Sequence, residues 1–420
     1  MTSGIPVFPA TKKLLRFTAE DLSCSGRFCS VNLRKSKDAL VVAEGEEVAF
    51  TPSGGVAGIV CLNDELYSVS ESGKQIQNAS DKTRYAVGAC RLLSYVMKDG
   101  TKKVYAVTDD DIYCLTSGAS LTAKGKGGVS CAVFAERVFT AKGSRVSYSG
   151  PLAPDDWQER RYGAGYLELP HTAGDIYAIE PYKERLYLFR KNGITVLRVL
   201  GDELNFKATY LPLKQGSLLQ GSVAKCGEGI GYFTDRGFYV FNGATSELRL
   251  SRSRWDIDTA QPVKAVSCRG RYYALVKRTA GETAVFSYDP DEREGYLIGN
   301  SAEDLAAGDE VYFLRGNKVY RMTERGISYG KEAWFTLDGV AFNAGGEKTL
   351  YALALDGAGS FKVVVSSARG TRTATVQAGK PHRLRSPIRG SGFQVSVYAL
   401  SSDACIRSIE FAYTEEDDGY

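Results

Sequence analysis

A hairpin pattern that recurs seven times constrains the fold of this chain more than any other feature of its sequence. Each copy contains a short apolar segment with an aromatic residue, then a turn, then a second apolar segment. The aromatic anchors of the seven copies are Tyr67, Tyr105, Phe139, Tyr187, Tyr232, Tyr273 and Tyr312. Successive anchors lie 34 to 48 residues apart, with a mean spacing of about 41 residues. A period of this length indicates repeated structural units.

Each repeat is long enough for two strands beyond its hairpin. A hairpin by itself is only marginally stable in water, so we expect the remaining residues of each repeat to complete a four-stranded sheet. Four-stranded sheets that repeat around an axis form a β-propeller, with roughly 40 to 50 residues in each repeat. The sequence therefore predicts an all-β fold with a β-propeller over residues 58–328. Seven blades are expected if every repeat completes its sheet, and five or six if short early repeats merge; a series of packed sandwiches is the alternative.

The turn of the fourth repeat carries the dipeptide Asn192-Gly193. Asn-Gly is favoured in the two-residue turns of β-hairpins, because these turns require positive φ angles. We therefore expect Gly193 to occupy a turn position with a positive φ.

Two segments flank the predicted propeller. Residues 1–57 contain two strand-like stretches, and we expect this N-terminal arm to supply outer strands that close the last blade. After residue 328, seven short apolar stretches follow one another at roughly 10 to 12 residues, a spacing typical of a β-sandwich. The sequence thus predicts a C-terminal β-sandwich over residues 329–420, with an acidic tail at 415–418. Helix is expected to be almost absent, with one turn at most at 302–307.

The residues that commonly carry catalysis are scattered through the sequence. The two histidines, His171 and His382, fall in different predicted domains, and neither accompanies a nucleophile motif. The nine cysteines contain no Cys-x-x-Cys pair of the kind that zinc sites use, so we expect most of them to be small buried residues of strands. Carboxylates cluster at 109–111 and 289–294, where neighbouring side chains point to different faces, and we interpret both clusters as turns. We expect no catalytic residue, no metal site and no cofactor, and hence no enzyme.

Charge is unevenly distributed although its total is almost balanced. The 53 basic and 49 acidic side chains give a net charge of +4, which argues against a general nucleic-acid-binding protein. Between residues 362 and 407, however, the chain has eight Lys or Arg and a single acid. The centre of this segment is a candidate DNA- or partner-facing basic patch, made of Lys380, Arg383, Arg385 and Arg389; on a strand, Arg383 and Arg385 share a face. DNA phosphates or an acidic protein neighbour would suit the patch, and a strand edge kept from aggregating is the alternative.

We expect neither a membrane-spanning helix nor a secretory signal in this sequence. No stretch of about 18 uncharged apolar residues occurs, so we expect no spanning helix. The first residues lack the basic region and the apolar core of a secretory signal. We therefore expect the chain to be made and folded in a cytoplasm.

Three of the repeats resemble blades of bacteriophage tail and neck propellers. The stretch AVFAERVFTAKGSRVSYSG (132–150), followed by PLAPDDW (151–157), is similar to the pattern R-L-F…G-N-x-V-x-Y-S and D-P-x-x-W of such blades. The stretches 185–197 and 231–243 resemble two further blades, and the run 383–411 is similar to the terminal sandwich of these proteins.

The resemblance covers roughly residues 50–415 and implies a structural protein of the virion. Tail hub, nozzle and packaged-DNA stabilisation proteins of short-tailed phages belong to this group. It implies several copies in a homo-oligomeric ring around the DNA exit channel, in contact with portal, adaptor or other tail proteins and, non-specifically, with DNA in transit. The protein would be synthesised in the host cytoplasm and located in the tail or neck. Two alternatives stay open: a tail-tip propeller that binds a receptor or glycan, which the tyrosine-rich loop at 162–166 would support, and a propeller hydrolase, which the scattered catalytic residues disfavour.

Overall fold

Strands make up nearly all regular structure in this protein. The computed structural model describes residues 13–24, 28–43, 45–63, 65–117, 121–199, 205–213, 216–227, 229–251, 256–261, 263–299, 301–323, 333–340, 346–401 and 403–415. In these ranges the helical elements are α1 (Ala19–Cys24) and the 3-10 turns η1 (Leu115–Ser117) and η2 (His171–Ala173). None of the helices in the described ranges combines the length and the apolar character that a membrane crossing needs.

Contacts between residues divide the chain into two compact units. Unit 1 consists of Met1–Glu46, Ala284–Asn300 and Thr323–Tyr420. Unit 2 consists of Glu47–Thr283 and Ser301–Met322. Each unit is described separately below.

The described residues of unit 2 contain, wholly or almost wholly, six four-stranded antiparallel sheets. The first two sheets consist of β6 (Val56–Leu62), β7 (Glu65–Ser70), β8 (Ile76–Asn78) and β9 (Arg84–Tyr85), and of β10 (Arg91–Val96), β11 (Lys102–Val107), β12 (Asp111–Cys114) and β13 (Ala123–Lys126). The next two consist of β14 (Ser130–Phe134), β15 (Arg137–Lys142), β16 (Arg145–Tyr148) and β17 (Gly165–Glu168), and of β18 (Ile176–Tyr182), β19 (Arg185–Arg190), β20 (Gly193–Arg198) and β21 (Lys207–Pro212). The last two consist of β22 (Ala224–Cys226), β23 (Gly229–Thr234), β24 (Gly237–Phe241) and β25 (Ser246–Ser251), and of β30 (Asp304–Ala307), β31 (Val311–Arg315), β32 (Lys318–Thr323) and β5 (Gly45–Phe50). A further antiparallel pair consists of β26 (Lys264–Cys268) and β27 (Arg271–Lys277).

The seven anchors lie in equivalent strands, which confirms the repeat predicted from the sequence. Each anchor belongs to the second strand of its sheet or pair, namely β7, β11, β15, β19, β23, β27 or β31. Tyr105, Phe139, Tyr187 and Tyr232 are at most 1% exposed. An aromatic side chain in such an inner strand removes a large apolar area from water, and this burial stabilises the sheet.

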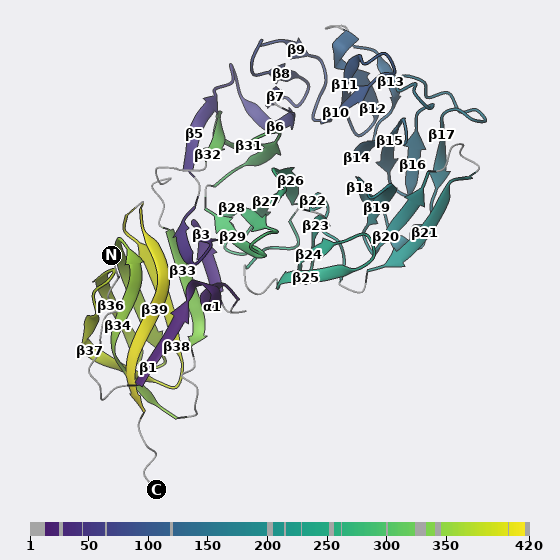
Figure 1. Cartoon of the computed structure of the whole chain (residues 1–420). Helices are drawn as coiled ribbons and strands as arrows, with labels where there is room; N and C mark the ends of the chain where they lie inside the picture. Colours follow the sequence, from purple (N-terminus) through teal and green to yellow (C-terminus); the bar gives the residue numbers. More distant parts are fainter. Residues whose placement is uncertain are drawn as a thin grey trace. The chain divides into compact units, whose positions relative to one another are not determined.

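The hydrophobic cores of unit 2 lie between successive sheets. One core joins Phe139 to Leu186 and Leu188 of the next sheet. Another joins Phe189 to Tyr232, with 5.6 Å between the two ring centroids. Figure 1 shows the sheets following one another around a ring, with β6, β10, β14, β18, β22 and β26 on its inner side. Neighbouring first strands such as β6 and β10, or β10 and β14, are in contact. This all-β arrangement is consistent with a β-propeller.

The last sheet of the ring takes its outer strand from the start of the chain. β5 lies beside β32 in the order β30-β31-β32-β5. Residues 45–50 are therefore placed next to strands that follow them by more than 250 residues. This is the position that we expected for an outer strand supplied by the N-terminal arm.

Two local expectations for unit 2 are wrong. Gly193 is a strand residue that pairs with Arg190 and has no positive φ, so the turn consists of Lys191 and Asn192. Glycine suits this strand position because a Cβ would overlap the ring of Tyr210. Residues 304–307 form β30 instead of part of a helical turn, since their backbone pairs with that of β31 in an antiparallel ladder.

Unit 1 contains two sheets that share one hydrophobic core. The first has the order β3 (Leu33–Ser36), β4 (Ala39–Val42), β39 (Cys405–Glu415), β34 (Lys348–Ala358) and β37 (His382–Gly390), with β1 (Lys13–Thr18) also paired to β39. The second includes β28 (Thr283–Asp289), β29 (Glu294–Ile298), β2 (Phe28–Val31), β33 (Ala333–Val340), β38 (Phe393–Ala399), β35 (Ser360–Ser367) and β36 (Gly370–Gln377). Leu353 and Phe411 of the first sheet and Phe361 and Val363 of the second belong to the shared core. All seven strands predicted after residue 328 are present as β33 to β39, whereas the predicted acidic tail lies, beyond its first residue, outside the described residues.

The unit boundaries differ from the expected division into 1–57, 58–328 and 329–420. Most of the N-terminal arm belongs to unit 1 because β2 pairs with β33 and β4 pairs with β39. Residues 284–300 also belong to unit 1, since β29 lies parallel to β2. These pairings join distant parts of the sequence, and no local pattern announces them.

Candidate functional site

The predicted basic patch lies on and beside an edge strand of unit 1. Its three arginines belong to β37, and Lys380 lies in the turn before this strand. β37 is the terminal strand in the order of its sheet, beyond β34. The arginines are exposed, whereas Leu384 and Ile388 are buried. Arg383 and Arg385 therefore both project into solvent from the same strand.

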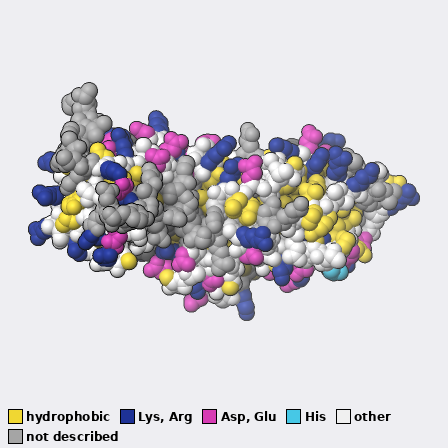
Figure 2. Space-filling model, turned by 90° about the horizontal axis from the view of Figure 1, so that it is seen from below, with side chains coloured by type: hydrophobic (Ala, Val, Ile, Leu, Met, Phe, Trp, Pro, Cys, Tyr) yellow, Lys and Arg dark blue, Asp and Glu magenta, His cyan; other side chains and the backbone are white. Residues whose placement is uncertain are grey.

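Two other charges of this basic segment are paired with acids, whereas most of the patch is not. Arg407 lies 3.2 Å from Asp356, and Arg369 forms an ion pair with Glu347. Apart from Arg389, the patch residues have no ion-pair partner in the part of the chain that the structure describes. Figure 2 shows several Lys and Arg side chains at its left end, the end at which Figure 1 draws β36 and β37. The patch thus presents positive charge to solvent.

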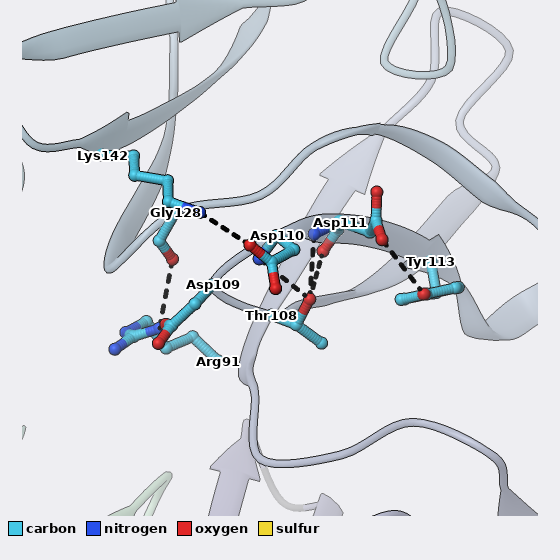
Figure 3. Close-up of polar contacts among 8 residues, drawn as sticks. All are labelled: Arg91, Thr108, Asp109, Asp110, Asp111, Tyr113, Gly128 and Lys142. Atoms are coloured by element: carbon cyan, nitrogen blue, oxygen red, sulfur yellow. Dashed lines mark hydrogen bonds and ion pairs between the residues drawn. The ribbon is translucent and has the colours of Figure 1, made fainter.

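The acidic run 109–111 is the turn between β11 and β12, as the sequence indicated. The Thr108 hydroxyl accepts a hydrogen bond from the backbone N–H of Asp111 at 2.9 Å and stabilises this turn. The three carboxylates point to separate partners (Figure 3): Asp109 to Arg91 at 3.2 Å, Asp110 to Lys142 at 2.6 Å and Asp111 to Tyr113 at 3.4 Å. This geometry does not place two acids across a common substrate, as glycoside hydrolysis requires.

The second acidic cluster and the histidines also have structural surroundings. The Asp289 carboxylate accepts hydrogen bonds from the backbone N–H groups of Asp291 and Glu292, so this cluster is a turn as well. His171 lies exposed in η2, with its Nδ1 3.0 Å from the Ser144 hydroxyl. His382 is the first residue of β37, in the other unit. Among the described residues, no group of three His, Cys, Asp or Glu side chains is placed to hold a metal ion.

The tyrosine-rich loop lies at the outer edge of the third sheet. Tyr166 belongs to β17, so the apparent insertion supplies the fourth strand of this sheet. Tyr162 is 52% exposed and Tyr166 is 41% exposed. The guanidinium carbons of Arg161 and Arg145 lie 4.9 Å and 4.1 Å from the two ring centroids. Each arginine thus lies over one face of a tyrosine ring.

Sequence reasoning missed a central cavity in unit 2. A cavity of about 990 Å³ is lined by the first strands β6, β10, β14, β18, β22, β26 and β30 and the residues beside them. Its charged lining residues are Arg91, Asp109, Glu180, Lys225 and Lys264. No sequence motif marks this cavity, because each strand contributes only a few lining residues. The residues contributed by successive strands are separated by a whole repeat in the sequence.

A partly exposed ion pair joins three of the strands around the cavity. The Lys264 ammonium lies 2.7 and 2.9 Å from the two carboxylate oxygens of Asp304, and it donates a hydrogen bond to the Ile59 carbonyl at 3.0 Å. Asp304 in turn accepts a hydrogen bond from the Ile59 N–H at 2.7 Å. Strands β26, β30 and β6 are thereby connected on the inner side of the sheets.

The thiols that line the cavity are poor nucleophiles. Burial raises the pKa of Cys90 to about 12 and that of Cys131 to about 11. Nucleophilic attack and metal binding require the thiolate, which both residues lack at neutral pH. Five further described cysteines form no disulfide; Cys114, Cys226 and Cys268 are buried, in line with the expected packing role, whereas Cys61 and Cys405 are half-buried.

Glu180 should make the stability of the protein depend on pH. Burial raises the pKa of Glu180 to about 7, against a partial opposing effect of Lys225. The folded protein therefore holds this proton more tightly than the unfolded chain, and its contribution to stability is lost as the pH rises from about 4.5 through 7. We expect Glu180→Gln to raise the free energy of unfolding by about 2 kcal/mol at pH 8 and by little at pH 5. Urea unfolding at both pH values measures this difference.

The control for this change is Glu184→Gln, which removes an exposed carboxylate in the turn between β18 and β19. It should leave the pH dependence unchanged. An equal effect of Glu180→Gln at pH 5 and pH 8 would contradict the prediction.

Comparisons with known proteins give a fold likeness without a family. No protein-family model and no curated protein matches this chain. The extracellular domain of the putative one component system BT4673 from B. thetaiotaomicron is 10% identical, with a TM-score of 0.47 over 90% of this chain and 61% of that chain. PorZ, a type-IX secretion component of Porphyromonas gingivalis, is 10% identical, with a TM-score of 0.42 over 79% of this chain and 46% of that chain. The Pan2 WD40 domain of Neurospora crassa is 10% identical, with a TM-score of 0.41 over 71% of this chain and 99% of that domain.

The chain thus spans only part of the length of BT4673 and about half of PorZ. Likeness at such identities and TM-scores assigns no function to it. The functional argument rests on the residues of this chain.

Proposed function

We propose that this chain is a structural subunit of a bacteriophage tail or neck, present as a ring of copies around the DNA exit channel. Its role is assembly of the particle and retention of the genome, without enzymatic activity. In this proposal unit 2 is a propeller with seven blades, one for each anchor, and unit 1 is a β-sandwich. Support for the architecture comes from the seven equivalent anchor positions and from the shared core of the two sheets in unit 1.

The observation that carries the proposed role is the basic patch at β37, in which Lys380, Arg383 and Arg385 have no ion-pair partner in the part of the chain that the structure describes. Solubility alone is served by interspersed charge and does not require a segregated cluster. Arg383 and Arg385 project together from an edge strand, where they can reach a phosphate backbone or an acidic protein surface. Contacts to phosphates carry no sequence information, and a channel lining must let any sequence pass.

The proposed contact should be weak for one copy and appreciable for a ring. Tight binding by each subunit would oppose DNA ejection. When several copies are linked in a ring, binding of one copy raises the effective concentration of DNA at the others. The ring can therefore bind DNA appreciably although each individual contact is weak. The patch therefore suits an oligomer better than an isolated DNA-binding protein.

The patch is tested by changing Arg383, Arg385 and Arg389 together to Ser. We expect normally folded protein but a strong loss of DNA-filled infectious particles when the variant replaces the wild-type chain in a phage production assay. With purified oligomer, the slope of log affinity for duplex DNA against log salt should decrease by about 2 to 3 units, because each phosphate contact contributes about 0.9.

A matched triple variant separates this effect from a general loss of charge. Lys98, Lys102 and Lys124 are exposed lysines of unit 2, and their change to Ser removes the same charge from another surface. This control should retain infectivity and the salt slope. Fully infectious, DNA-filled particles with the arginine variant would refute the proposed role, and the patch would then be a strand edge kept soluble by charge.

A further inference from the structure

A small polar pocket lies on one face of the first sheet in unit 2. It has a volume of about 120 Å³ and lies between the loop 52–56 and the strands β7, β8 and β9. This is the space of about four water molecules, which matches the size of a five-atom oxyanion. Its polar lining side chains are Ser53, Ser68, Ser70, Gln75, Gln77 and Arg84.

The strand register aligns three of these side chains in a row. Ser68 of β7 lies directly opposite Gln77 of β8, and Gln77 lies directly opposite Arg84 of β9. Side chains that are paired across neighbouring strands share a face of the sheet. The opposite face carries Tyr67 and Val69, which pack into the hydrophobic core. The polar row is therefore separate from the residues that hold the sheet to its neighbour.

Among the side chains of this row, Ser68 gives the clearest indication of a bound ligand. It is only 4% exposed, and its hydroxyl has no hydrogen-bond partner in the part of the chain that the structure describes. This hydroxyl is not among the fully enclosed polar atoms that lack a partner, so it can be reached from the pocket. Since Ser68 lines the pocket, a guest in the pocket would satisfy it.

The charge of the lining selects an anion. Arg84 is the charged residue among those that line the pocket, and no carboxylate of the described chain lies within ion-pair distance of it. Its Nη2 donates a hydrogen bond to the Ser53 hydroxyl at 3.1 Å, which places the guanidinium beside the loop. The nearest acid, Glu71, lies against Gly55 on the loop and is not among the lining residues. A guanidinium with several hydroxyl and amide donors suits oxyanions, because it forms strong charge-assisted hydrogen bonds with them.

We propose that this pocket binds a small tetrahedral oxyanion, phosphate or sulfate, either free or as the terminal group of a larger small molecule. Arg84 supplies the charge, and Ser68 supplies a hydroxyl donor. This site lies on unit 2 and is independent of the basic patch on β37.

The test is a calorimetric titration of the full-length protein with inorganic phosphate and with sulfate, at constant ionic strength in chloride. We expect one saturable site per chain with a Kd of about 10 mM or tighter. Arg84→Gln should weaken binding at least about tenfold, and Ser68→Ala about three- to tenfold, because each removes a donor to a charged acceptor. The control Arg198→Gln changes an exposed arginine on the sheet of β18 to β21 and should leave the Kd unchanged.

Further outcomes identify the source of the anion or overturn the site. Tighter binding of phosphoserine or a nucleoside monophosphate than of inorganic phosphate would identify a terminal phosphoryl group, and the reverse order would identify the free ion. Unchanged thermal unfolding of both variants in the absence of anion shows that lost binding is not lost folding. The proposal is overturned if the wild-type protein shows no saturable binding, if chloride competes as well as sulfate, or if Arg84→Gln binds like the wild-type protein.

Discussion

Replacement of Arg137 by Met should lower the free energy of unfolding of unit 2 by about 3 to 4 kcal/mol. Arg137 is 1% exposed, and its Nη1 donates hydrogen bonds to the carbonyl oxygens of Ser149 (2.8 Å) and Gly163 (2.5 Å). Its guanidinium carbon also lies 5.3 Å from the ring centroid of Tyr148. Methionine fills a similar volume but leaves the two carbonyl groups without their donor in a buried place, which is the main cost.

Chemical denaturation followed by intrinsic fluorescence measures this loss. The matched control is Arg198→Met, the same substitution at an exposed position at the end of β20. It should change stability by less than about 0.5 kcal/mol. Equal effects of the two substitutions would show that the carbonyl contacts of Arg137 contribute nothing to the fold.

Replacement of Asp304 by Ala should cost about 2 kcal/mol and loosen the closure of the sheets in unit 2. The change removes the partner of Lys264 and the acceptor of the Ile59 N–H, and it leaves both groups on the inner side of the sheets. Asp304 and Ile59 are 245 residues apart in the sequence. Loss of their contact should therefore weaken the junction between β30 and β6 in particular.

Hydrogen exchange distinguishes this local effect from a general loss of stability. We expect faster exchange in β6 and β30 than in β14 or β18, where no contact is lost. Asp309→Ala removes an exposed carboxylate five residues away and serves as the control. The role assigned to the ion pair fails if Asp304→Ala unfolds at the same denaturant concentration as this control.

Local sequence patterns were sufficient for most of the predicted strands, although not for residues 304–307, which form β30. The position of Tyr187 in the second strand of its sheet follows from apolar segments on both sides of a turn, which a dozen neighbouring residues specify. The strands β33 to β39 follow from the same kind of pattern. The acidic run 109–111 was also readable as a turn, because side chains of adjacent residues diverge. The prediction at Gly193 failed because a close approach by the Tyr210 ring, and not the turn, requires the glycine.

Only the tertiary structure decided which strands lie next to one another and which side chains meet. The pairing of β5 with the last sheet, the pairing of β2 with β33 and β29, and the contact between Lys264, Asp304 and Ile59 all join residues far apart in sequence. The central cavity and the row from Ser68 to Arg84 likewise depend on register between strands. Whether a segment forms a strand depends on the alternation of apolar residues and on the turn residues within a short stretch of sequence. Which strands pair depends on which apolar faces, distant in sequence, can be buried together. The positions of strands can therefore be predicted from local sequence, whereas strand pairing is visible only in the folded structure.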